Sequence, residues 1–282
     1  LQVMLRLFSR ILRILLPSAA LLLVACDKSN RDLEFGERDL MADFDAFTKR
    51  YNKHIEKSLQ AEREGFAKKL TEAKAELEQA DDSNRERISG RIADLERDLE
   101  RIDYRLSHDG YFSFKSPADI PKNLIWCDGM DQPIIGDPRA TKGGTFRMPI
   151  SAYPATLRRF GRGSNHAYRG WIYDNLVVEL VGQHPITQQY IPGIAKRWAM
   201  GADGRTVFYE IDPRAEYSDG HPIRAKDFML SVYVRSSDNV VDPYYKQYLK
   251  DQYANITVYD DLHLSISLPE KKPLLPLYAA LP

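Results

Sequence analysis

Residues 211–223 read IDPRAEYSDGHPI, and the turns in this stretch separate an alternating segment from a helical one. Before it, the side chains of residues 206–211 alternate between two faces, as in a β-strand. Asp219 and Gly220 then form a tight turn. After the turn, residues 225–234 carry apolar side chains at helical spacing. We therefore expect a strand, a turn and a helix in succession.

The expected helix over 225–234 has one buried face and a carboxylate in its first turn. The buried face is formed by Ala225, Phe228, Met229 and Val232. Asp227 lies where a carboxylate stabilises a helix N-terminus. Arg224 precedes the helix and has no side-chain acceptor, so we expect Asp227 to satisfy this helix end alone and the first turn to fray.

A β-hairpin is predicted directly upstream. Its first arm begins at Trp198, its turn is residues 201–204 (GADG), and its return arm is residues 206–211. One side of the return arm carries Val207, Tyr209 and Ile211.

Further elements are expected on both sides of this hairpin. Residues 143–148 predict a turn that enters a strand, and residues 168–181 predict a helix. After a turn at Asp260 and Asp261, apolar residues alternate along 262–268, which predicts another strand.

Short motifs from residue 142 onward occur in a characteristic order. They are residues 142–147 (KGGTFR), 173–176 (YDNL), 191–195 (IPGIA), 203–204 (DG) and 217–223 (YSDGHPI). This order resembles the family 5 extracellular solute-binding proteins, the peptide-binding components of ABC importers, and the segment 211–220 is most similar to the microcin C and oligopeptide branch. The resemblance covers residues 111–282. It implies an α/β, periplasmic-binding-protein-like (type 2) lobe, which we expect to be incomplete because relatives are about twice this length.

The resemblance also implies where a ligand is held. By position in the family pattern, the residues expected to line the mouth of the cleft are Arg162, Gly163, Ser164, Asn165 and Tyr244. Glycine lets the backbone approach a ligand, the serine and asparagine supply polar groups, the arginine pairs with a carboxylate and the tyrosine offers a flat face. A solvated loop cation is the alternative role for Arg162. His166 is the histidine that lies in this loop.

Residues 38–107 are predicted to form a long α-helical coiled-coil hairpin. One apolar stripe runs from Leu40 to Leu77, and a second begins behind a capping box at Ser83 and Glu86. The second stripe alternates steps of four and three: Ile88, Ile92, Leu95, Leu99, Ile102 and Leu106. We expect the second helix to fold back antiparallel on the distal part of the first.

Two roles are open for this hairpin. A helix of about forty residues would reach roughly 60 Å, enough to act as a spacer above a membrane. The alternative is self-association or docking through the proximal stripe, Phe44 to Leu59, which has no evident partner within the sequence.

The N-terminus resembles a bacterial lipoprotein signal. Residues 1–25 combine three arginines with an apolar run that is too short to span a bilayer, and residues 23–26 read LVAC. We expect a lipidated Cys26, a tether over 26–37, and insertion of the acyl chains in the lipid bilayer. Asp27 resembles the signal that retains lipoproteins in the inner membrane, which predicts a lipid-anchored protein of the periplasm.

Composition and motifs argue against several other classes. Lysine plus arginine equal aspartate plus glutamate at 40 each, so the chain has no net positive charge that would attract nucleic acid. Cys127 is the only cysteine besides Cys26, and we expect it to be a small core residue. The six histidines have no ligand-like pairing, and no nucleophile has a nearby base.

Together these features predict a solute-binding lipoprotein of an ABC importer, not an enzyme, with no cofactor. Its expected partners are an oligopeptide or other small-molecule ligand and an ABC permease in the inner membrane. The alternative is an envelope lipoprotein that acts as a structural or interaction module through its coiled-coil arm.

Overall fold

The computed structural model describes residues 37–145, 177–236, 240, 243–273 and 275–279, together with positions 147, 149, 153–158, 161–164, 166, 168, 170 and 173. Cys26, the leader and Asn165 lie outside these residues. The chain divides into two compact units, Leu1–Phe47 and Thr48–Pro282. Of the first unit, the structure describes the beginning of helix α2; all other elements belong to the second. Within the described residues, no helix combines the length and apolar character needed to cross a membrane.

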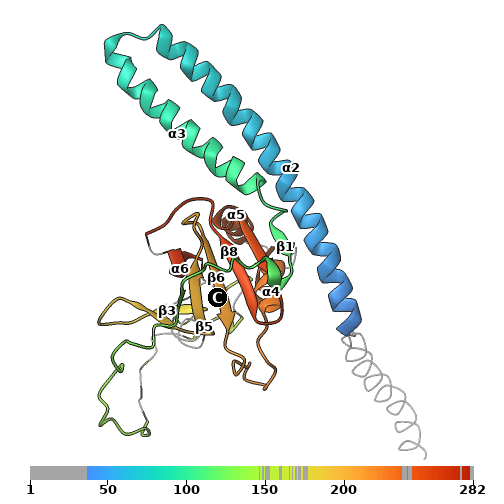
Figure 1. Ribbon diagram of the computed structural model, residues 1–282, viewed down its shortest axis with the longest axis vertical. Coiled ribbons are helices and arrows are strands. Elements are labelled where there is room, and N and C mark those ends of the chain that lie inside the picture. The colour runs from blue at the N-terminus through green and yellow to red at the C-terminus, as the bar shows by residue number, and fades with distance from the viewer. Residues whose placement is uncertain are drawn as a thin grey trace, which may run out of the picture. The chain divides into compact units, whose positions relative to one another are not determined.

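The predicted helical hairpin is confirmed. Its helices are α2 (Glu37–Glu78) and α3 (Asp82–Leu106), visible in Figure 1. Ion pairs join them in antiparallel order: Arg63 with Asp103 (2.6 Å), Lys74 with Glu96 (2.8 Å), and Glu76 with Arg91. Ile88, Leu95 and Ile102, each seven residues apart, are the buried apolar residues of α3.

The expected capping box at Ser83 and Glu86 is wrong, because the N-cap of α3 is Asp81. Its carboxylate accepts a hydrogen bond from the backbone N–H of Asn84 (3.0 Å), and the Ser83 hydroxyl donates to the same carboxylate (2.8 Å). A charged acceptor interacts more favourably with the N-terminal end of the helix dipole than a neutral hydroxyl does. The hydrogen bonds from Ser83 and Asn84 lower the pKa of Asp81.

A six-stranded sheet forms the centre of the second unit. In spatial order its strands are β1 (Phe112–Phe114), β7 (Asn255–Val258), β8 (His263–Ser267), β6 (Thr206–Ile211), β5 (Ala195–Met200) and β2 (Trp126–Cys127). Neighbours are antiparallel except β1 and β7, which are parallel. A separate ribbon pairs β3 (Val181–Gln183) with β4 (Tyr190–Pro192).

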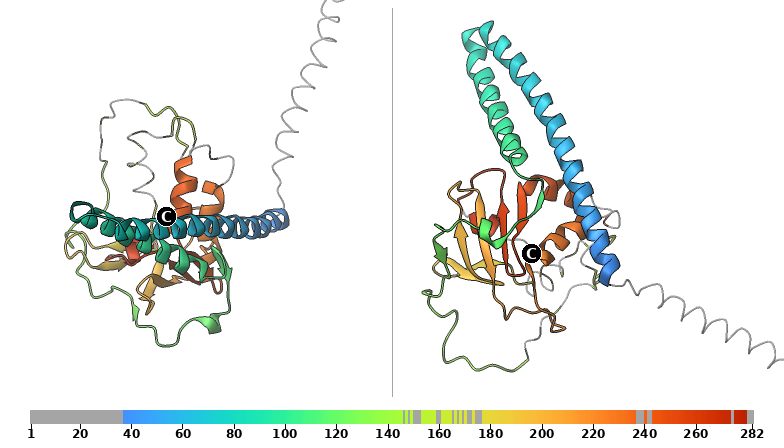
Figure 2. Two further views of the ribbon diagram at one scale, coloured as in Figure 1. Left: turned by 90° about the horizontal axis from the view of Figure 1, so that it is seen from above. Right: turned by 45° about the vertical axis from the view of Figure 1, so that its right-hand side comes forward.

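Short helices complete the lobe. They are the 3-10 turn η1 (Pro117–Asp119), α4 (Ala225–Ser236), α5 (Pro243–Gln252) and α6 (Leu275–Tyr278). Helix α4 packs on β7 and on α5, while α6 contacts β6, an arrangement seen from two sides in Figure 2. Fully buried side chains from the sheet and from α4, including Tyr209, Ile266 and Met229, form the core between them.

The local predictions around residues 195–268 are confirmed. The β5–β6 hairpin turns at residues 201–204, although its first arm begins at Ala195 and not at Trp198. The four residues assigned to the buried face of α4 are all buried. The alternating stretch 262–268 contains β8, with Leu264 and Ile266 buried.

Two element predictions differ from the structure. Thr145 and Arg147, the described positions of the strand expected after Gly144, are not in a strand, and Gly143 and Gly144 both have positive φ. The helix expected over 168–181 does not reach its predicted end, since residues 177–179 are irregular and Val181 begins β3. In short apolar segments, the spacing of apolar residues alone cannot distinguish a helix or a strand from irregular structure.

The expectation that Cys127 is a core residue is also wrong, because its side chain is exposed and free. It lies in β2, a two-residue strand whose described partner is β5. Trp126, the other residue of this strand, is half-buried, so Cys127 lies on the more open face of the strand.

The N-terminal end of α4 has more support than the sequence indicated. Asp227 accepts from the backbone N–H of Arg224 (2.8 Å), as expected for a first-turn carboxylate. The carbonyl of Asp261 accepts from the N–H of Ala225 (2.8 Å), and the Asp261 carboxylate pairs with the Arg224 guanidinium. Asp227 therefore does not satisfy this helix end alone.

The proximal stripe of α2 has a partner within the chain from Tyr51 to Leu59. The Tyr51 ring meets Tyr111 edge-on at 5.2 Å and Phe112 at 5.6 Å. Ile55 and Leu59 are buried and line one cavity together with Tyr111. The expectation of an unpartnered stripe is therefore wrong over this part, and the base of the hairpin packs on the lobe.

Candidate ligand-binding site

Tyr244, one of the expected ligand residues, lies on the exposed side of α5. Its ring is stacked on that of Tyr248, with centroids 5.6 Å apart and planes 20° from parallel. The two residues are four apart, the spacing that brings side chains together on one helix face. Tyr244 is 62% exposed and Tyr248 40%, so the pair presents a flat aromatic surface to solvent.

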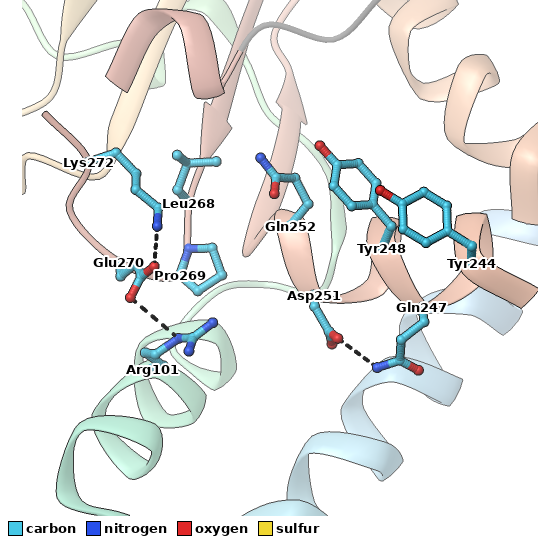
Figure 3. A pocket seen from close by; sticks show the side chains of 10 residues that line it. All are labelled: Arg101, Tyr244, Gln247, Tyr248, Asp251, Gln252, Leu268, Pro269, Glu270 and Lys272. Atoms are coloured by element: carbon cyan, nitrogen blue, oxygen red, sulfur yellow. Dashed lines mark hydrogen bonds and ion pairs between the residues drawn. The ribbon is translucent and has the colours of Figure 1, made fainter. Parts of the chain in front are cut away.

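This aromatic pair forms one wall of a pocket with a volume of about 380 Å³. Three elements contribute to it: α3, α5 and the segment after β8 (Figure 3). The lining residues are Arg101, Tyr244, Gln247, Tyr248, Asp251, Gln252, Leu268, Pro269, Glu270 and Lys272. The volume is at the lower end of the range of small-molecule sites.

Charges of both signs line this pocket. Glu270 accepts from the ammonium of Lys272, and the Arg101 guanidinium lies 3.9 Å from its other oxygen. The hydrogen bond from Lys272 lowers the pKa of Glu270. Asp251 accepts from the side-chain amide of Gln247 at 2.6 Å. The arrangement combines a flat apolar face with polar groups, which suits a ligand that has both an apolar part and a polar part.

The hairpin fixes the position of α5, the helix that carries this aromatic pair. The Tyr111 hydroxyl donates to the carbonyl of Leu249 at 2.6 Å, and the buried Arg105 guanidinium donates to the carbonyl of Lys250. The Lys250 ammonium in turn pairs with Glu62 of α2 at 2.5 Å. Since these contacts hold the C-terminal half of α5, Tyr244 and Tyr248 are placed by both the lobe and the hairpin.

The expected loop residues form a turn of their own. Gly161 and Gly163 have positive φ of 106° and 78°, which glycine adopts without strain. The Ser164 hydroxyl is buried and donates to the carbonyl of Gly161 at 2.8 Å, whereas Arg162 is exposed. His166, in the same loop, contacts the carbonyl of Thr156 at 2.9 Å through Nε2.

The structure thus brings Arg162, Gly163 and Ser164 together but does not place them in the pocket of Tyr244. Asn165 and Cys26 lie outside the described residues. A ligand role for these residues stays a prediction. The predicted site does not include Arg101 or Tyr248. The four-residue spacing of the tyrosines could have indicated Tyr248, whereas nothing local indicates that Arg101 shares a pocket with residues so distant in sequence.

A larger cavity of about 710 Å³ lies beside the motif residues 193–194 and 215–218. It is mainly apolar, and Leu230 and Val234 of α4 line it. Burial, with a further contribution from Asp227, raises the pKa of Tyr217 in this cavity to about 12. No cluster of three or more potential metal ligands occurs among the residues that the structure describes.

Residues 189–282 match the profile described as bacterial extracellular solute-binding proteins, family 5 Middle. This segment begins just before β4 and includes the motifs 191–195 and 217–223. A probable ABC transporter-binding protein of Deinococcus radiodurans is 27% identical over 92 residues, which are 32% of this chain and 16% of that protein. The predicted resemblance to family 5 solute-binding proteins is therefore confirmed for this part of the chain, and so is its α/β fold class with a preceding helical hairpin.

Solved structures give partial overlaps. Haemophilus influenzae OppA, in complex with the peptide RPPGFSPFR, is 19% identical with a TM-score of 0.33. The Escherichia coli murein tripeptide binding protein MppA is 23% identical with a TM-score of 0.32. Each alignment covers 38% of this chain and 24% of the solved chain. The chain thus spans well under two thirds of these relatives.

Proposed function

We propose that this chain is part of the substrate-binding component of an ABC importer, which captures oligopeptides or similar small solutes in a two-lobed cleft and delivers them to a membrane permease. The observation that carries the proposal is the family 5 match over residues 189–282. The similarity to a probable ABC transporter-binding protein of Deinococcus radiodurans agrees with it.

The proposed mechanism rests on the chemistry of an extended peptide. Its backbone offers alternating donors and acceptors, so a cleft can hold it by strand-like hydrogen bonds while side chains rest in tolerant, hydrated pockets. Tyr244 would supply a flat face and Arg162 a partner for a carboxylate. Closure of two lobes about a hinge would bury the ligand and create the form that a permease recognises.

The proposed location is the periplasm, with acyl chains on Cys26 holding the protein at the inner membrane. The LVAC sequence at residues 23–26 and the following Asp27 support this assignment. Radiolabelled palmitate fed to expressing cells should label the wild-type protein and not Cys26→Ser. Equal labelling of both proteins would overturn the lipid anchor without affecting the binding role.

A binding experiment tests the proposed function. A mixed pool of short peptides should raise the melting temperature of the full chain, because a ligand that binds only the native state stabilises it by mass action. Arg162→Ala should reduce the shift for peptides with free carboxylates and leave it unchanged for amidated ones. An unaltered melting temperature across the pool would argue against peptide capture.

The alternative role, an interaction module that acts through the hairpin, has less support. The hairpin base contributes side chains to the lobe interior, so a lobe without residues 31–107 would expose β1 and Tyr111. The arm and the lobe therefore need to be tested in the same intact chain. Partner proteins that bind the full chain while peptides do not would favour this alternative.

A further inference from the structure

Arg101 is a residue of the helical hairpin that lines the pocket of Tyr244. It lies on α3, outside the family-matched segment 189–282, yet it lines the same pocket as Tyr244 and Glu270 (Figure 3). We propose that Arg101 is a specificity-determining residue, which selects ligands that combine an aromatic ring with a carboxylate. This inference rests on the proposed solute-binding function, and it adds a ligand class and a contact from the hairpin.

The first argument is the unused donor capacity of Arg101. A guanidinium has five N–H donors in a fixed, planar arrangement. Its ion pairs, with Asp98 at 3.7 Å and Glu270 at 3.9 Å, are both longer than a hydrogen bond. Within the described part of the chain, the Arg101 side chain donates no hydrogen bond, and it is 36% exposed. The guanidinium can therefore donate two parallel hydrogen bonds to a ligand carboxylate without breaking a close contact.

The second argument is that the acidic groups of the pocket already have partners. Glu270 accepts from Lys272, and Asp251 accepts from Gln247. The most available polar group is therefore a cationic donor, which favours an anionic ligand group over a cationic one.

The third argument is the aromatic wall. The stacked rings of Tyr244 and Tyr248 offer exposed aromatic surface in the same pocket as Arg101. Aromatic rings gain from offset or edge-on contact with such a surface in addition to the burial of area. A ligand with both groups would engage the wall and the guanidinium together.

The fourth argument is that the α3 segment around Arg101 is held in place. Ile102 is buried, and the Tyr104 hydroxyl donates to Asp203 of the β5–β6 turn at 2.8 Å. Arg205, which pairs with Glu100, also stacks on the Tyr104 ring at 4.4 Å. A side chain on a fixed helical turn can discriminate between ligands, because little ordering is needed when the ligand binds.

The test is calorimetric titration of the full chain with N-acetyl-tyrosine and with N-acetyl-tyrosinamide, which lacks the carboxylate. We expect the acid to bind at least about fivefold more tightly than the amide. Arg101→Gln should reduce this preference to less than about twofold, and Tyr244→Ala should weaken both probes. Glu270→Gln should increase affinity for the acid by removing a competing carboxylate.

The matched control is Arg97→Gln, one turn earlier on α3. Arg97 pairs with Asp94 at 2.7 Å and does not line the pocket, so the acid preference should stay unchanged. Far-UV circular dichroism checks that each variant is folded. Three results would overturn this inference and leave the proposed function standing. They are equal affinity for the acid and the amide, an acid preference that persists in Arg101→Gln, and failure of both probes to bind while a peptide pool does bind. Failure of every peptide would overturn the proposed function with it.

Discussion

The side chain of Asn52 pairs with both backbone groups of Phe112, sixty residues further along the chain. Its carbonyl oxygen accepts from the Phe112 N–H at 2.8 Å, and its amide nitrogen donates to the Phe112 carbonyl at 2.8 Å. Phe112 belongs to β1, the outermost strand beside β7. A side-chain amide from α2 thus occupies the place of a further strand and protects the sheet edge from unwanted pairing.

Asn52→Ala should lower the free energy of unfolding by about 1–3 kcal/mol, because it leaves two partly buried backbone groups without partners. Urea denaturation followed by fluorescence measures the change. Gln60→Ala, which removes an exposed amide from the same helix, is the control and should change stability by less than about 0.5 kcal/mol. Equal effects of the two substitutions would contradict the structural role of Asn52.

Leu95→Asp should unfold much of the helical hairpin. Leu95 is buried in the seam of α3, and a carboxylate there loses solvation without gaining a partner. Far-UV circular dichroism should show a clear loss of helical signal. Ser89→Asp adds the same charge at an exposed position of α3 and should keep the signal. A full helical signal from Leu95→Asp would mean that the two helices do not depend on each other.

Asp212 should give the protein an acid-sensitive contribution to stability. Hydrogen bonds from the Arg214 side chain and backbone lower the pKa of Asp212 to about 2 from 3.8. A carboxylate with a lowered pKa stabilises the native state above its unfolded pKa, and this contribution is lost as the pH falls from about 4 to about 2.

The effect should be at most about 1 kcal/mol, because the Asp212–Arg214 pair is in contact with solvent. Denaturation of wild type and Asp212→Asn at a series of pH values measures it. The two stability curves should converge towards pH 2. A constant difference over the whole range would exclude the assigned pair.

Cys127 should react with a maleimide in the native protein, since its side chain is exposed. Peptide mapping after labelling without denaturant should find near-complete modification at this residue. Cys127→Ser should abolish that labelled peptide and leave the melting temperature nearly unchanged. Reaction only after unfolding would restore the original expectation of a core cysteine.

The sequence was most informative where the structure depends on residues that are close together along the chain. The turn at residues 201–204, the buried face of α4 and the seam of α3 all follow from spacing within one or two turns or strands. The error at Ser83 arose because Asp81 lies two residues away and is an equally good cap by composition.

The sequence was least informative where distant segments meet. The parallel pairing of β1 with β7 joins residue 112 to residue 256, and no local pattern encodes that choice. Arg101 and Tyr244 share a pocket only because the hairpin base packs on α5. The exposure of Cys127 likewise depends on which face of β2 other segments cover, and the sequence around Trp126 and Cys127 does not indicate that.

Mass spectrometry of the natively purified protein tests the central claim most directly. If the protein is the capture component of an importer, a small molecule of peptide or similar mass should accompany it through purification and be released on denaturation. A protein that carries no such molecule, and that takes up none when it is incubated with a peptide library, would contradict the account.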